Sequence, residues 1–141
     1  MKPTFVDTWG WCAFADRSDG GHARVVRTVR DEWSGNLSVV TTDFVLDETI
    51  TLVFRRLAFL KAKRFMNSMD ASIDGGFVEV QSISPERFAE AKKLRLKFRD
   101  KPRISFTDLS SFVVMRELGL VDVITDDEHF QHVGFGFRKI G

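Results

Sequence analysis

The chain has 141 residues, of which 43% are apolar and 29% are charged, and its formal net charge is +1. This length corresponds to about one domain, and the composition is that of a folded protein rather than a disordered one. The balanced charge excludes a polycation, so nucleic-acid binding requires local basic clusters. The single Cys12 excludes an intramolecular disulfide and a cysteine-rich zinc site, and one reduced thiol is typical of a cytoplasmic protein.

Short strands are expected to alternate with helices along the chain. Turn and capping signals separate these elements, as where Ser84 and Pro85 mark the start of a helix. No apolar run is long enough to span a membrane. In chain order we expect strand 4–6, helix 8–16, helix 25–33, strand 37–41, helix 42–58, helix 61–69, strand 77–80, helix 85–98, helix 105–118, strand 121–124 and an edge strand 135–137.

Helices of this length between strands favour parallel pairing through right-handed crossovers. The expected fold is therefore a three-layer α/β/α sandwich with a central, mostly parallel sheet, Rossmann-like in arrangement. No linker, repeat or low-complexity segment is visible, so residues 1–141 are expected to form one domain.

Several acidic residues are expected near the carboxyl ends of the strands, where ligands bind in such sheets. Asp7 directly follows the first strand, and Asp127 follows strand 121–124, while Glu48 and Asp108 lie early in helices. A cluster of carboxylates is unfavourable alone because the like charges repel, and Mg²⁺ or Mn²⁺ relieves that repulsion through oxygen ligands. The alternative interpretation is that Asp7, Asp43 and Asp108 only cap helices.

Other chemistries have little support in the sequence. Neither a GxxxxGK[ST] phosphate loop nor a GxSxG nucleophile motif is present. His129 and His132 are three residues apart, but a surface turn is favoured there over a zinc site. Cys12 is expected to be a small buried residue of the first helix.

Four segments together resemble the PIN-domain family, and within it the VapC-like branch. These segments are TFVDTWGW (residues 4–11), TTDFVLDETITLV (41–53), SFTDLSSFVVMRELGL (105–120) and VDVITDDEHF (121–130). The resemblance places the family's four acids at Asp7, Glu48, Asp108 and Asp127. Asp47 is the less favoured neighbour of Glu48, and Asp126 is a further candidate ligand.

The resemblance implies an endoribonuclease whose four acids hold one or two Mg²⁺ or Mn²⁺ ions. Thr8, Thr125 and Ser110 are expected to orient ligands or waters, with ordinary helix capping as the alternative role. Basic residues after the second acid are expected to guide RNA, although a solvated helix face explains them equally: Arg55, Arg56, Lys61, Lys63 and Arg64. Trp9 and Trp11 are interpreted as core or interface residues rather than base-stacking residues.

The resemblance also implies partners. The expected assembly is a cytoplasmic homodimer, inhibited by a small antitoxin protein and acting on RNA as the toxin of the pair. Two alternatives stay open: a PIN nuclease in RNA processing or acting on structured DNA, and a nucleic-acid-binding PIN module without catalysis.

Overall fold

The computed structural model of the protein describes residues 2–141, which form five strands and seven helices. In chain order they are β1 (Phe5–Val6), α1 (Thr8–Ala15), α2 (His22–Ser34), β2 (Val39–Thr42), α3 (Asp43–Arg56), α4 (Phe59–Asp74), β3 (Val78–Gln81), α5 (Pro85–Lys97), α6 (Phe106–Leu118), β4 (Asp122–Ile124), α7 (His129–His132) and β5 (Arg138–Ile140).

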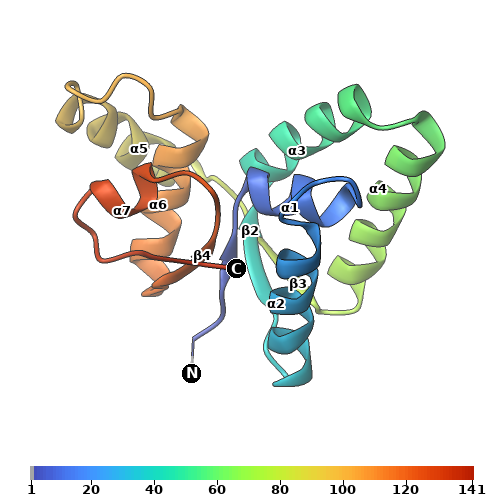
Figure 1. The fold of residues 1–141 in the computed structure, drawn as a ribbon. Coiled ribbons are helices and arrows are strands. Elements are labelled where there is room, and N and C mark those ends of the chain that lie inside the picture. The colour runs from blue at the N-terminus through green and yellow to red at the C-terminus, as the bar shows by residue number, and fades with distance from the viewer. Residues whose placement is uncertain (1) are drawn as a thin grey trace.

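The strands form one parallel sheet in the order β3-β2-β1-β4-β5. Figure 1 shows α5, α6 and α7 on one side of the sheet and α1 and α2 on the other, which confirms the expected α/β/α sandwich. The central strand β1 pairs with β2 and β4, with Phe5 opposite both Val40 and Val123. The carboxyl ends of β1, β2 and β4 are therefore neighbours at one edge of the sheet.

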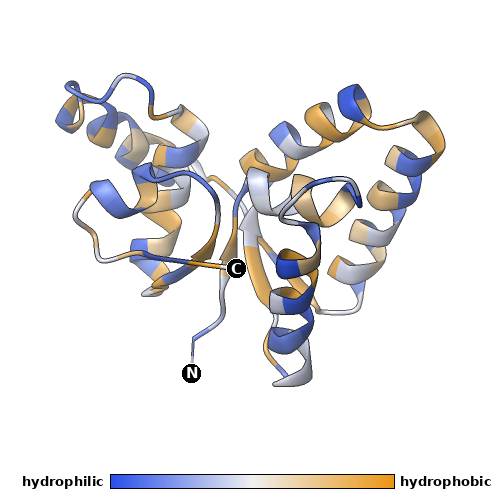
Figure 2. Ribbon diagram, in the orientation of Figure 1, coloured by the Kyte–Doolittle hydropathy of each residue, from blue (hydrophilic) through white to orange (hydrophobic). Residues whose placement is uncertain are grey.

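The core consists of strands that are buried on both faces and of the inner sides of the helices. Phe5, Val40 and Val123 have no exposed surface, as expected for a parallel sheet covered by helices. Figure 2 shows the same division, since α2 is largely hydrophilic while β2 behind it is hydrophobic. On α2, Val25 and Val29 are the buried residues, one helical turn apart.

The last strand is not where the sequence indicated. The expected strand 135–137 is wrong, because Gly134 and Gly136 have φ angles of 77° and 81°, outside the range of a strand. The rings of Phe135 and Phe137 lie 6.3 and 5.7 Å from that of Phe112, so their apolar pattern serves an aromatic cluster. The edge strand is instead Arg138–Ile140, which pairs with β4.

The boundary between α3 and α4 also differs from the expectation. Leu57 and Ala58 have ψ angles of 156° and 145°, so α3 ends at Arg56 and α4 begins at Phe59 rather than at residue 61. α4 then continues to Asp74, beyond the expected end at residue 69. In the part of the chain that the structure describes, no helix combines the length and apolar content that a membrane crossing needs.

Candidate active site

Asp7 lies at the carboxyl end of the central strand, where it caps α1. One of its carboxylate oxygens accepts a hydrogen bond of 3.0 Å from the Gly10 amide, and the other accepts one from the Thr125 hydroxyl. A Cβ atom at Gly10 would lie 2.8 Å from Val6 Cγ1 and 2.9 Å from the Ile124 carbonyl oxygen. Glycine therefore lets α1 approach β1 and β4 closely enough to bury Asp7, which is only 5% exposed.

Thr125 joins two of the acidic residues. Its hydroxyl donates to Asp7 and accepts a hydrogen bond of 2.9 Å from the Asp127 amide. Asp127 in turn accepts a 2.8 Å bond from the His129 amide. One buried hydroxyl at the end of β4 thus fixes the backbone of Asp127 relative to the carboxylate of Asp7.

Asp108 reaches the same place from α6. Ser105 caps this helix, and its hydroxyl oxygen accepts a 3.0 Å bond from the Asp108 amide, so Asp108 lies in the first turn. Oxygen atoms of Asp108 and Asp127 and a ring nitrogen of His129 all lie within 4.8 Å of one another. That spacing matches side chains able to share one metal ion.

His129 is a site residue that sequence analysis did not assign. Its Nδ1 lies 3.0 Å from Asp127 Oδ1, although the two atoms are not aligned as a hydrogen bond. The spacing Asp-x-His at the start of the short helix α7 was visible in the sequence. It carried no signal for this contact, because the contact depends on how the turn after β4 folds.

Glu48 lies near the site on α3, outside the close group of Asp108, Asp127 and His129. It lies between the buried residues Val45 and Thr49 and is half-buried, whereas Asp47 is exposed. Burial is the main cause of the raised pKa of Asp7 and of Asp108, and the negative charge of Glu48 adds to both shifts. These observations favour Glu48 over Asp47 as the acid contributed by α3.

The carboxylates are poorly neutralised within the protein. Burial raises the pKa of Asp7 to about 7; the hydrogen bonds from Thr125 and Gly10 oppose this shift, and the charges of Asp127 and Glu48 reinforce it. Burial is also the main cause of the raised pKa of Asp108. The hydrogen bond to Asp127 and the charges of the acidic neighbours raise this pKa further. Buried, mutually repelling oxygen ligands fit a hard divalent cation, which removes the repulsion.

The other predicted site residues have different surroundings. Asp126 is exposed, and its Oδ1 lies 3.6 Å from Lys139 Nζ. The Ser110 hydroxyl donates a 2.7 Å bond to the Thr107 carbonyl within α6, and Thr8 is buried at the start of α1. Of the three hydroxyl residues proposed to orient ligands, Thr125 is the one bonded to an acid of the site.

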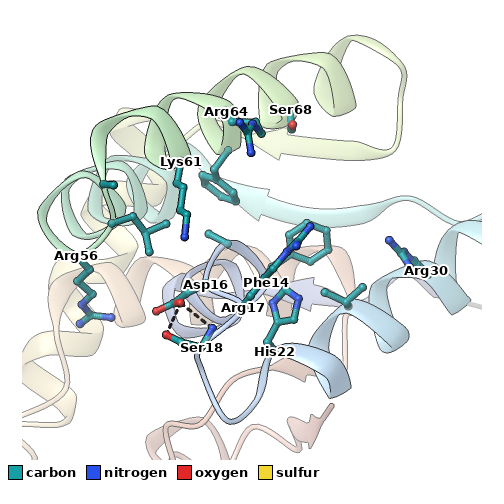
Figure 3. Close-up of a pocket in the computed structure, with 15 residues that line it drawn as sticks. Phe14, Asp16, Arg17, Ser18, His22, Arg30, Arg56, Lys61, Arg64 and Ser68 are labelled. Atoms are coloured by element: carbon teal, nitrogen blue, oxygen red, sulfur yellow. Dashed lines mark hydrogen bonds between the residues drawn. The ribbon is translucent and has the colours of Figure 1, made fainter.

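The predicted basic residues are divided among two cavities and the open surface. Arg56, Lys61 and Arg64 line a cavity of about 680 Å³, shown in Figure 3. Lys63 and Arg64 line a second one of about 400 Å³. Arg55 is exposed and lines neither of these two cavities.

Trp11 and Cys12 are structural residues. Trp11 is 1% exposed, and its indole N–H donates a 3.1 Å bond to the Thr41 hydroxyl, so it is a core residue as expected. Cys12 is buried as expected, and burial raises the pKa of its thiol to about 11. Thr41 donates to the Val6 carbonyl, which ties the ends of β1 and β2 together beside Asp7.

Comparison with known proteins identifies the family of this fold and site. The PIN-domain model matches residues 4–136. The chain is 30% identical over 132 residues to the 23S rRNA-specific endonuclease VapC20 of two Mycobacterium tuberculosis strains. This alignment covers 93% of this chain and 94% of the relative. The crystal structure of M. tuberculosis VapC20, described as a sarcin–ricin loop cleaving toxin, superposes with a TM-score of 0.76 over 96% of this chain and 98% of that one. The chain therefore belongs to the PIN-domain family and, within it, to the VapC-like branch of endoribonucleases.

Proposed function

We propose that the protein is a Mg²⁺- or Mn²⁺-dependent endoribonuclease that acts as the toxin of a toxin–antitoxin pair. The observation that supports this proposal is that ligand atoms of Asp108, Asp127 and His129 lie within 4.8 Å of one another, while the charges of Asp7 and Glu48 also act on Asp108. Burying like charges at this edge is costly for folding, and groups with pKa values raised in this way are typical of functional sites.

The four acids are proposed to hold the metal, with His129 beside Asp127 as an additional contact. A divalent ion held by these residues would supply positive charge beside the scissile phosphate and would make water near it more acidic. The residues of the chain hold the acids in place for that task. Thr125 fixes Asp7 and the Asp127 amide together, and the Gly10 amide fixes the second oxygen of Asp7.

The role of each buried hydrogen bond is to keep the acids ionised and oriented. The Thr125 hydroxyl and the Gly10 amide both lower the pKa of Asp7 and so oppose the effect of burial. These two donors are in place before the metal binds, because both come from the strand-to-helix junctions of the fold. Less reorganisation is then needed when the ion and the RNA arrive.

Cleavage of labelled RNA tests the nuclease directly. A stem–loop with the sarcin–ricin sequence is the first substrate, since the similar VapC20 is described as cleaving that loop. We expect cleavage with Mg²⁺ or Mn²⁺ and none with EDTA or with Asp108→Asn. Asp47→Asn is the matched control, because Asp47 is an exposed carboxylate on α3 that points away from the other acids. Cleavage that persists in EDTA would contradict a metal-dependent mechanism.

The toxin role and the assembly need separate tests. Expression of the protein in the cytoplasm of a bacterial host is expected to arrest the growth of that host. Glu48→Gln is expected to relieve the arrest. Coexpression with a small antitoxin encoded by a neighbouring gene should also relieve the arrest. Sedimentation of the purified protein should show a homodimer. RNA cleavage in vitro without growth arrest would instead favour an RNA-processing nuclease.

A further inference from the structure

A groove beside the active site has basic side chains on two facing walls. Arg56, Lys61 and Arg64 come from the end of α3 and from α4, whereas Arg17, His22 and Arg30 come from the α1–α2 connection and α2. Figure 3 shows Lys61 on α4 pointing toward the loop that carries Asp16 and Ser18. The groove encloses about 680 Å³, enough for part of an extended strand.

The charge in this groove is strongly positive and largely free. Its lining contains five Arg or Lys side chains and one carboxylate, Asp16. That carboxylate accepts bonds of 2.9 and 2.7 Å from the amide and hydroxyl of Ser18, and these bonds, together with the charge of Lys61, lower its pKa. Within residues 2–141, none of the five cations forms an ion pair. Facing cations without partners repel each other, which favours an anionic ligand between the walls.

The groove lies at the far ends of the two helices that position Asp7 and Glu48. Asp7 caps the start of α1, and Phe14 and Asp16 at its end line the groove. Glu48 lies on α3, whose last residue, Arg56, also lines the groove. Arg56 follows Glu48 by eight positions, which is about 12 Å along the helix at about 1.5 Å per residue. An RNA strand with a phosphate at the acids can therefore reach the groove within a few nucleotides.

We propose that this groove binds the phosphate backbone of the RNA strand that leaves the cleavage site, held between Arg17 and Arg30 on one wall and Lys61 and Arg64 on the other. The inference rests on the proposed nuclease function and adds the α1–α2 wall to the substrate path.

The composition of the lining favours RNA over an acidic peptide. Four of the five cations are arginines, whose planar guanidinium groups match phosphate oxygens in pairs. The partly buried rings of Phe14 and Phe65 also line the groove and offer apolar surface to bases or ribose. Proteins that bind single-stranded RNA usually hold the phosphates along the rims of a groove and stack the bases on aromatic rings.

The test compares two double variants with equal loss of charge. Arg17→Ala/Arg30→Ala removes the new wall, and Arg24→Ala/Arg27→Ala removes two exposed cations that do not line the groove. Both pairs are introduced into Asp108→Asn protein, and binding of a fluorescent single-stranded RNA is followed by anisotropy from 0.05 to 1 M salt. Losing two phosphate contacts should reduce the slope of log K against log salt by about 1.4. The groove variant should then bind roughly 25-fold more weakly at 0.1 M salt and equally at 1 M, with little change in the control.

Equal slopes and affinities in the two double variants would overturn the proposal. The groove proposal is also overturned if polyglutamate binding depends on Arg17 and Arg30 while RNA binding does not, because the groove is then a site for acidic peptides. Failure of the nuclease proposal is recognised separately, as absence of RNA cleavage by the unmodified protein. RNA binding lost only in the groove variant supports the groove even in that case.

Discussion

Replacing Asp7 by asparagine is expected to stabilise the metal-free protein at high pH. Asp7 is 5% exposed, and burial raises its pKa from 3.8 to about 7. The native protein therefore holds this proton more tightly than the unfolded chain does. The stability associated with this group is present below about pH 4 and is lost as pH rises toward 7.

The size of the effect follows from the pKa shift. The pKa of Asp7 rises by about 3 on folding, and a pKa difference of 1 corresponds to about 1.36 kcal/mol. The free energy of unfolding is therefore about 4 kcal/mol lower once Asp7 is fully ionised. Asparagine carries no charge and keeps the capping role, since its side-chain oxygen can accept from the Gly10 amide. It disturbs the hydrogen bond from Thr125, at a cost of about 1 kcal/mol. The expected net gain is about 3 kcal/mol at pH 8.

Urea unfolding in EDTA at several pH values between 4 and 8.5 measures this difference. The free energy of unfolding of Asp7→Asn should match or fall below that of the parent protein near pH 4 and exceed it near pH 8. Asp47→Asn removes an exposed carboxylate from α3 and should leave the parent's pH dependence unchanged. If the difference in unfolding free energy between Asp7→Asn and the parent stays constant across this pH range, Asp7 is not a buried, poorly neutralised carboxylate.

Three further substitutions test the supports of the site. Gly10→Ala should destabilise the protein by about 1–3 kcal/mol in urea, because its Cβ would lie 2.8 Å from Val6 Cγ1, and unchanged stability would contradict the close packing of α1. Thr125→Val should slow RNA cleavage at least about tenfold while the fold persists, since Asp7 and the Asp127 amide lose their shared partner. Arg95→Met should cost about 2–3 kcal/mol, because this side chain donates to three backbone carbonyls that precede α6, and wild-type stability would exclude that role.

The sheet and the acids at its edge were predictable because their signals are local. A buried strand followed at once by a polar residue places Asp7 at the carboxyl end of β1 and Thr125 at that of β4. Choosing Glu48 over Asp47 needed the family resemblance. In the structure it depends on which side of α3 turns inward, with Val45 and Thr49 buried on either side of Glu48.

What the sequence left out depends on contacts between distant segments. The alternating phenylalanines at 135 and 137 mimic a strand, but they pack around Phe112, which no local pattern reports. The contact of His129 with Asp127 arises from the turn after β4. Likewise, Arg17 and Arg30 line one groove with Lys61 and Arg64 only because the α1–α2 connection and α2 lie opposite α4.

Cleavage by Glu48→Gln and Asp47→Asn, measured side by side with Mn²⁺ on the same RNA, tests the central claim most directly. The two variants each remove one negative charge from adjacent positions of α3, and only Glu48 is directed to the other acids. The four-acid site predicts a loss of at least about 100-fold in kcat/KM for Glu48→Gln and a rate within about twofold of the parent for Asp47→Asn. Equal rates for the two variants, or a greater loss for Asp47→Asn, would contradict it.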